Sequence, residues 1–241
     1  MFNPRPLEAL AFRAALHFSA GLAMDTAMPT NEDLAKLRRE YSMRGLLEHE
    51  LAADPLAQFH AWLDEALAHG LIEPNAMTLS TTDATGQPWS RTVLLKTCDS
   101  RGFVFFTNYD SHKGEQLAHD PRCALTFWWN ALERQVNIIG TVEKVSRPET
   151  EAYFALRPAS SCLGAWASRQ SSVLPDRAAL EAAMEKARAL HGESPPAPPH
   201  WGGYVVRPAV IEFWQGRQSR LHDRLRYTRT ADDWRIERLA P

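Results

Sequence analysis

The middle of the chain consists of short segments with strand-like composition, and this feature constrains the fold more than any other. The segments are rich in β-branched and aromatic residues, and clusters of Gly, Pro, Asp and Ser separate them. This spacing is typical of antiparallel strands joined by tight turns. It predicts a mainly β protein with peripheral helices, arranged as a closed or partly closed barrel. The expected strands are residues 77–82, 91–97, 103–108, 123–129, 134–145, 204–214 and 233–239.

Helical patterns flank these strands. The clearest has Asp54 as N-cap and Pro55 in its first turn, carries apolar residues on one face, and ends at Gly70. Ser146 and Glu149 form a capping box at the start of another helix. The expected helices are residues 31–40, 55–69, 111–119, 146–156 and 176–190, and the Pro-rich residues 194–200 are expected to form an extended linker.

Composition and charge place the chain among ordinary globular proteins. Hydrophobic residues make up 44% of the 241 residues, and the net charge of −2 lacks the basic excess of a nucleic-acid-binding domain. No apolar run approaches the roughly 18 residues of a membrane span. The cysteines and histidines show no disulfide or metal-ligand spacing. We therefore expect a soluble, cytoplasmic protein with reduced thiols, no bound metal and no nucleic-acid or membrane partner.

The first 30 residues are treated apart from the fold. They have few acidic residues and an apolar stretch that Arg13 and His17 interrupt, which resembles a secretory signal poorly and a transit peptide only faintly. We expect residues 1–30 to be a flexible or mis-started N-terminal tail. Residues 31–241 are expected to form one domain.

One expected strand, residues 91–97, is apolar on both faces, with Val93 and Leu95 on one face and Leu94 on the other. A strand of this kind is covered on both sides. In a barrel of this size a second copy of the chain can supply one cover. The sequence therefore predicts a homodimer.

Basic residues gather at the ends of the expected strands. Arg91 and Lys96 bound one strand and point to opposite faces, Lys113 follows another within a helix N-terminus, and Arg134 with Gln135 opens a third. Converging cations with a helix N-terminus are what a phosphate group requires. Each cation alone could equally extend to water beside an apolar strand.

Two further groups of residues indicate anion binding. Tyr153, Arg157 and Ser161 follow one helix face and its end, and they could bind a second phosphate or form a surface Tyr–Arg stack. Arg220, His222 and Arg224 alternate, so in an extended chain they share a face. That arrangement favours an anion between them, with a solvated edge strand as the alternative.

These residues lie in motifs that closely resemble the pyridoxamine 5'-phosphate oxidase family from about residue 34 to the C-terminus. The resemblance implies an FMN-binding split β-barrel, homodimeric, with two FMN sites at the dimer interface. It implies oxidation of pyridoxamine or pyridoxine 5'-phosphate to pyridoxal 5'-phosphate, with O2 reduced to H2O2. The motifs are RTVLLK (91–96), FVFFTN (103–108), LERQVNIIG (132–140), YFALRPASS (153–161), GAWASRQSS (164–172), WGG (201–203), IEFWQG (211–216), RLHDR (220–224) and ERLAP (237–241).

The resemblance also implies roles for single residues. Arg220 and His222 would be catalytic, residues 38–41 would form part of a lid over the substrate, and residues 201–241 would supply a dimerisation and active-site segment. FMN would be bound by Arg91, Thr92, Val93, Leu94, Leu95, Lys96, Phe106, Thr107, His112, Lys113, Gln135, Gln170, Ser171, Trp214 and Arg224. The substrate would be bound by Arg38, Tyr41, Lys96, Tyr153, Arg157, Ser161, Arg220, Leu221 and His222.

The chain departs from the family pattern at three positions. His112 stands where Arg is common, Phe106 where Tyr is common, and Glu73 where Asp is common. His112 would make one cationic contact dependent on pH. Two other functions stay open: another FMN-dependent split-barrel oxidoreductase, and a non-catalytic protein that binds FMN or pyridoxal phosphate.

Overall fold

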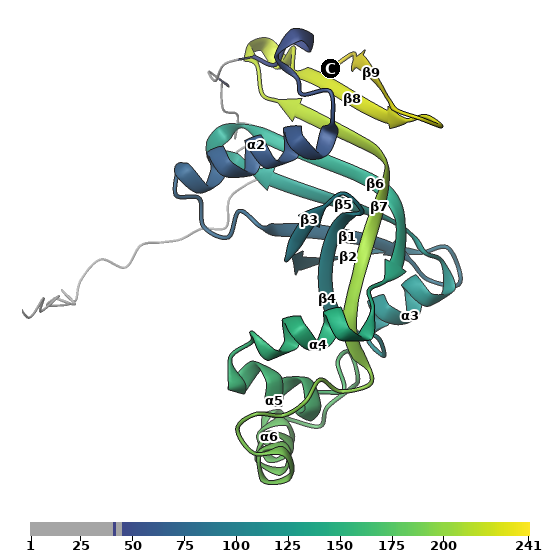
Figure 1. Cartoon of the computed structure of the whole chain (residues 1–241). Coiled ribbons are helices and arrows are strands. Elements are labelled where there is room, and N and C mark those ends of the chain that lie inside the picture. Colours follow the sequence, from purple (N-terminus) through teal and green to yellow (C-terminus); the bar gives the residue numbers. More distant parts are fainter. Residues whose placement is uncertain (1–40, 42–44) are drawn as a thin grey trace, which may run out of the picture. The chain divides into compact units, whose positions relative to one another are not determined.

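One curled antiparallel sheet carries the fold (Figure 1). The structure, a computed structural model, describes residue 41 and residues 45–241. The tail 1–30, the expected helix 31–40 and Arg38 lie outside the described residues. The sheet has the order β2-β1-β5-β6-β7-β4-β3, and β8 pairs with β7 and β9. The strands are β1 Ala76–Thr82, β2 Pro88–Leu94, β3 Thr97–Asp99, β4 Gly102–Asn108, β5 Arg122–Trp129, β6 Arg134–Lys144, β7 Trp201–Gln215, β8 Asp223–Arg229 and β9 Trp234–Leu239.

The longest strand, β7, connects the two ends of this sheet. One of its edges pairs with β6, and the other edge is shared between β4 at its beginning and β8 at its end. The register of the β6–β7 pair shifts between Ile139 and Gly140, next to Pro208. Proline has no N–H for the ladder, so a bulge at this position is expected. A Cβ at Gly140 would overlap the carbonyl of Arg207, so only glycine fits the close approach.

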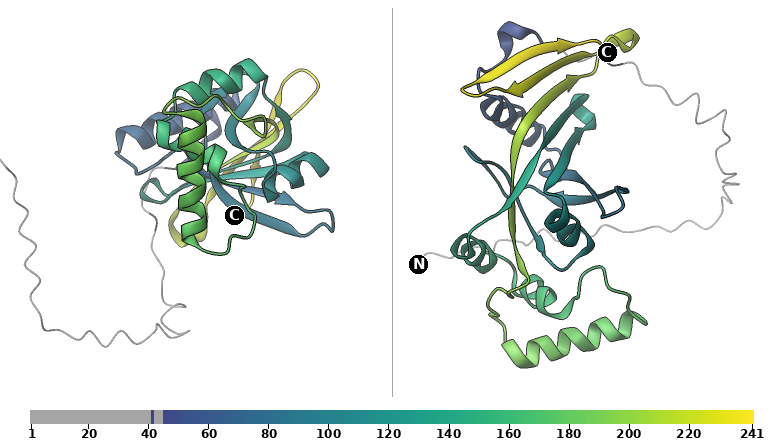
Figure 2. Two further views of the ribbon diagram at one scale, coloured as in Figure 1. Left: turned by 90° about the horizontal axis from the view of Figure 1, so that it is seen from below. Right: turned by 90° about the vertical axis from the view of Figure 1, so that its right-hand side faces the viewer.

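Helices cover the sheet and one of its ends. Helix α2 lies against the sheet, α3 is beside β1, and α4 to α6 gather near the beginning of β7 (Figures 1 and 2). No helix in the described part of the chain is long and apolar enough to cross a bilayer. The helices are α2 Pro55–Ala68, α3 His112–His119, α4 Arg147–Ala155, α5 Ala159–Ala167 and α6 Arg177–His191, with short 3-10 turns η1 Glu48–Glu50, η2 Asn130–Leu132 and η3 Gln218–Arg220.

Helix α2 shows how the sequence sets the core. Asp54 caps it by accepting a hydrogen bond from the Leu56 N–H, as its position predicted. Phe59 is fully buried, and its ring lies 4.9 Å from that of Phe103 and 5.0 Å from that of Phe127. The apolar stripe of the helix therefore packs into the core against the strands.

Most expected elements are confirmed to within a few residues, and the mainly β architecture with peripheral helices is confirmed. The exception among the strands is residues 91–97. The chain pairs with β1 as far as Leu94 and then changes partner, because the Lys96 N–H donates to the carbonyl of Val104 on β4. Strand β2 is an edge strand whose Val93 and Leu94 are only half-buried within one chain. The expected cover is therefore not supplied by this chain's described residues.

Besides the short β3 and the 3-10 turns, helix α5 and strand β8 are not among the expected elements. Helix α5 is short and follows Pro158, so it has neither a side-chain cap nor a long apolar stripe. Strand β8 carries many charges, although its alternation of buried Leu225 and Tyr227 is a regular strand signal.

Truncation of Phe59 tests this core. Phe59→Ala removes a ring that contacts three aromatic neighbours, and it should lower the free energy of unfolding by about 3–5 kcal/mol. Leu67→Ala on the same helix is the control, because Leu67 is 57% exposed and its loss should cost less than about 0.5 kcal/mol. Urea denaturation followed by circular dichroism measures both, and equal losses would contradict the assigned burial.

Candidate active site

A cavity of about 630 Å³ opens between the end of β2, the end of β4 and helices α4 and α5. It brings together Lys96, Tyr153, Arg157 and Ser161, which are the residues predicted to hold the substrate phosphate, and many of those predicted to bind FMN. The predicted residues that line it are Thr92, Val93, Leu94, Lys96, Phe106, Thr107, Lys113, Tyr153, Arg157, Ser161 and Gln170.

Arg157 is the cation most firmly set into the wall of this cavity. Its guanidinium lies over the ring of Trp201, at 4.6 Å from the centroid, and burial lowers its pKa. Its Nη1 is buried and has no hydrogen-bond partner among the described residues. A buried donor without an acceptor is costly, so this atom points to an acceptor supplied by a ligand.

An aromatic platform supports the cations. The rings of Phe106 and Tyr153 stack at 4.1 Å, and both are nearly parallel to the ring of Trp201. Lys96 Nζ lies 6.0 Å from the Tyr153 centroid. Two cations thus share a rigid apolar floor at one end of the cavity.

The beginning of α3 forms another part of the wall. Ser111 caps the helix by accepting from the Gly114 N–H. Lys113 Nζ donates to Gln170 Oε1 at 2.8 Å, and the His112 N–H donates to Ser171 Oγ at 3.3 Å. Burial, followed by the nearby charge of Arg91, lowers the pKa of Lys113 to about 8. A helix N-terminus beside a desolvated ammonium is suited to an anion.

Several predicted cofactor residues do not line this cavity. His112 and Ser171 face an adjoining cavity of about 550 Å³. Leu95 is buried in the core. Arg91 donates to Thr81 Oγ1 at 2.5 Å and to Gln116 Oε1 at 2.9 Å, so its guanidinium is already engaged within the protein.

The remaining predicted residues form a second cluster at the other end of β7. Gln135 pairs with Trp214 across β6 and β7, and Trp214 pairs with Arg224 across β7 and β8. The ring of Trp214 lies 4.6 Å from that of His222 and 5.7 Å from that of Tyr41. The cluster therefore joins residues predicted to bind cofactor and residues predicted to bind substrate.

The turn before β8 corrects the expectation that Arg220, His222 and Arg224 share one face of an extended chain. Ser219 and Arg220 have left-handed backbone conformations, with φ of 55° and 60°, so Arg220 lies in a turn. Arg224 forms an ion pair with Glu212, with contacts of 2.8 and 3.1 Å. Its charge is thus neutralised by a neighbouring strand.

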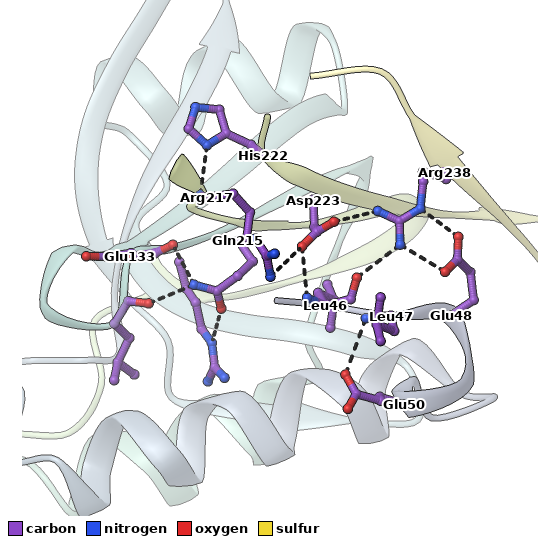
Figure 3. Close-up of polar contacts among 12 residues, drawn as sticks. Leu46, Leu47, Glu48, Glu50, Glu133, Gln215, Arg217, His222, Asp223 and Arg238 are labelled. Atoms are coloured by element: carbon purple, nitrogen blue, oxygen red, sulfur yellow. Dashed lines mark hydrogen bonds and ion pairs between the residues drawn. The ribbon is translucent and has the colours of Figure 1, made fainter. Parts of the chain in front are cut away.

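His222 is held in one tautomer. The Arg217 N–H donates to His222 Nδ1 at 3.1 Å, so the neutral ring carries its proton on Nε2 (Figure 3). Burial, followed by the charge of Arg220, lowers the pKa of His222. The ring is therefore a neutral hydrogen-bond donor at Nε2 around pH 7.

A polar network behind His222 is not predicted by the sequence pattern. Asp223 Oδ2 accepts from the Leu46 N–H at 3.0 Å, and Asp223 Oδ1 accepts from Arg238 at 2.6 Å (Figure 3). Arg238 also binds both carboxylate oxygens of Glu48. The sequence signal for this network is Asp223 in the RLHDR motif, because a carboxylate in such a position needs a hydrogen-bond partner.

The two clusters are too far apart to act on one small molecule within a single chain. Trp201 lies at one end of β7 and Trp214 at the other, which at about 3.3 Å per residue is on the order of 40 Å. Figure 2 shows the β8–β9 hairpin and helices α4 to α6 at opposite ends of the strand.

Comparison with known proteins identifies the class and then the family. Residues 63–191, which include most of the curled sheet and most of the lining of the cavity, match a family profile described as pyridoxamine 5'-phosphate oxidase. Residues 201–241 match the pyridoxine 5'-phosphate oxidase C-terminal dimerisation region. Proteins named pyridoxine/pyridoxamine 5'-phosphate oxidase are similar along most of the chain. One from Burkholderia thailandensis is 56% identical over 211 residues, and one from Ralstonia pickettii is 57% identical over 209 residues. Each match covers 86% of this chain and 99% of the relative. The chain belongs to the pyridoxine/pyridoxamine 5'-phosphate oxidase family.

Solved structures give the same fold. The crystal structure of PhzG from Burkholderia lata 383, in complex with tetrahydrophenazine-1-carboxylic acid, has a TM-score of 0.78 and 31% identity, and the match covers 83% of this chain and all of that one. A pyridoxamine 5'-phosphate oxidase-related, FMN binding protein from Nostoc punctiforme has a TM-score of 0.63 at 17% identity, over 79% of this chain and all of that one. The second likeness concerns the fold alone.

Proposed function

We propose that this protein is an FMN-dependent oxidase that converts pyridoxamine 5'-phosphate and pyridoxine 5'-phosphate to pyridoxal 5'-phosphate and reduces O2 to H2O2. The observation that carries the proposal is the cavity beneath α4 and α5, where the buried Nη1 of Arg157 lacks an acceptor. Lys96, Tyr153 and Ser161 complete a donor set suited to a phosphate ester. Relatives that carry the oxidase name support the same activity.

The proposed enzyme is a homodimer with two shared sites. Each chain would supply its cavity to one site and its Trp214–His222 cluster to the other, because β7 holds these groups at opposite ends. The exposed edge strand β2 supports this arrangement, and so does the likeness of residues 201–241 to a dimerisation region. A two-fold interface makes both sites equivalent.

The residues present fit FMN. Lys113, Gln170, Ser171 and the N-terminus of α3 would hold its phosphate, while Gln135, Trp214 and Arg224 of the second copy would contact the remainder. Arg91 would support the FMN site indirectly. It would do so through its hydrogen bond to Gln116 and through its positive charge near Lys113. Bound FMN would supply the two-electron oxidation and pass the electrons to O2.

The other groups of the chain bind and orient the substrate. Lys96, Tyr153, Arg157 and Ser161 would hold its phosphate, which is remote from the reacting carbon. Binding energy from that remote group can fix the carbon in a reactive orientation. Arg220 would hold the pyridine ring and stabilise developing charge, and His222 would donate a hydrogen bond from Nε2.

Two other functions have some support. The likeness to PhzG admits an oxidase of a polycyclic carboxylate, and the site alone would also serve a non-catalytic binding protein. Purified protein loaded with FMN and assayed for pyridoxal 5'-phosphate and H2O2 separates them. Oxygen-dependent formation of both products from pyridoxamine phosphate supports the proposal, and a yellow protein that releases neither contradicts it.

Substitution of the two arginines should separate binding from chemistry. Arg157→Ala should raise KM for pyridoxamine phosphate about 10- to 100-fold, because a charge-assisted contact to the phosphate is lost. Arg220→Ala should lower kcat roughly 100-fold. Steady-state kinetics measures both, with Arg177→Ala on the exposed face of α6 as control. Small and equal effects of both substitutions would discredit the assigned roles.

Mixed dimers test the shared site. In a dimer of one Arg157→Ala chain and one Arg220→Ala chain, one site carries both substitutions and the other carries neither. Such a dimer, purified through two different affinity tags and assayed at low substrate concentration, should show about half the wild-type activity. An activity no higher than that of either parent would exclude a site built from two chains.

Cofactor affinity should depend on the charge of Lys113. With a pKa of about 8, Lys113 is charged below this pH and neutral above it, and an anion binds the charged form more tightly. The Kd for FMN, measured by flavin fluorescence, should therefore rise between about pH 8 and pH 10. Lys113→Arg should keep the Kd level over this range, since arginine stays charged. If the Kd of the Lys113→Arg variant rises in the same way, a titrating group other than Lys113 causes the pH dependence.

A further inference from the structure

A bridge of one arginine and two carboxylates spans two elements outside the cavity. Arg101, in the turn between β3 and β4, donates from Nε and Nη2 to Asp99, with a shortest contact of 2.8 Å. From Nη1 and Nη2 it donates to both carboxylate oxygens of Glu149 on α4, at 2.9 and 2.8 Å. The guanidinium therefore joins the β3–β4 turn to α4 by paired hydrogen bonds.

Each end of this bridge leads directly to the proposed phosphate site. Asp99 ends β3, and β3 begins at the residue after Lys96. Glu149 lies in the first turn of α4, one turn before Tyr153 and about two turns before Arg157. The bridge thus connects the wall that carries Lys96 with the wall that carries Tyr153 and Arg157.

The turn that carries Arg101 is itself fixed. Its N–H donates to Asp99 Oδ1 at 2.9 Å, and Asp99 pairs with Gly102. Gly102 has φ of 135°, and a Cβ there would overlap the carbonyl of Val206 on β7. The turn therefore gives α4 a firm point of attachment on the sheet.

Helix α4 also contacts other parts of the chain. Phe154 packs edge-on against Trp201, and Arg147 donates to the carbonyls of Ala197 and Pro198. These contacts tie α4 to β7 and to the segment before it, and the stack of Tyr153 on Phe106 ties its later part to β4. The ion pair with Arg101 is what joins its first turn to the β3–β4 turn.

We propose that Arg101 is a positioning residue that sets the spacing between Lys96 and the Tyr153–Arg157 pair, and so the affinity for the substrate phosphate. The proposal rests on the proposed function. Arg101 would affect phosphate binding through the position of α4 and not through its own charge. Asp99, Glu149 and Arg101 together carry a net negative charge, which does not favour an anion. The hydrogen bonds from Arg101 lower the pKa of both carboxyls, so both stay ionised at neutral pH.

The chain offers a matched control. Arg122 donates to Asp120 in the same Asp-x-Arg geometry, with contacts of 2.6 to 3.1 Å, but contacts no second carboxylate among the residues that the structure describes. Arg122→Ala therefore removes a similar surface ion pair without releasing α4. The side chain of Arg101 is 37% exposed and that of Arg122 is 79% exposed. Ion pairs of solvent-accessible side chains contribute little to global stability, so neither substitution should prevent folding.

The test compares Arg101→Ala, Glu149→Ala, their double variant and Arg122→Ala. We expect the first two to raise KM for pyridoxamine phosphate about 10-fold, with kcat and the Kd for FMN within about twofold of wild type. The KM of the double variant should equal that of each single variant, because each single substitution already breaks the same Arg101–Glu149 bridge. Arg101→Lys should rescue only in part, because an ammonium cannot reproduce the paired fork.

Three results would overturn the proposal: a wild-type KM in Arg101→Ala, an equal rise in Arg122→Ala, or a parallel loss of kcat and FMN affinity. Amide hydrogen exchange of residues 147–155 gives a readout that needs no turnover. Faster exchange in Arg101→Ala than in Arg122→Ala supports the attachment of α4, and equal exchange rejects it. If residues 147–155 exchange faster in Arg101→Ala than in Arg122→Ala but the wild-type protein does not oxidise pyridoxamine phosphate, the proposed function fails and the attachment of α4 by Arg101 stands.

Discussion

The pairing of β7 along both of its edges is the constraint on which the rest of the structure depends. Its backbone joins β6, β4 and β8 into one sheet, and it holds the cavity at one end and the Trp214–His222 cluster at the other. The 15 residues of this strand, extended at about 3.3 Å per residue, hold its two ends far apart. Chemistry that needs both groups must therefore come from two chains.

In the proposed dimer this separation would link cofactor binding to association of the chains. The groups proposed to bind FMN on one chain would be completed by those of the other, so cofactor binding and dimerisation would stabilise each other by mass action. The orphaned Nη1 of Arg157 and the desolvated ammonium of Lys113 fit the same view. Both groups are donors already placed for an anion. Within one chain their burial costs free energy, because each has lost contact with water.

The sequence predicts local structure well where one period dominates. Helix α2 has a cap, an early proline and an apolar stripe, and the strands of the barrel alternate with clear turn residues. It fails where tertiary pairing decides: the corner at Lys96 depends on a bond to Val104, and the left-handed turn at Arg220 depends on the strands around it. The identities of the proposed site residues come from the motifs and stay a prediction. Their division into two distant clusters is not readable from the motifs, because only the register of β7 reveals it.

The contacts of Arg238 carry a consequence for synthesis of the chain. Arg238 binds Glu48, 190 residues earlier, and the carbonyl of Leu46. At about 5–20 residues per second, a ribosome needs roughly 10–40 s to make the intervening chain. The segment around Leu46 must therefore wait, exposed on the nascent polypeptide, until the final strand emerges. This corner of the molecule is completed only after β9 has left the ribosome, however early its first half was made.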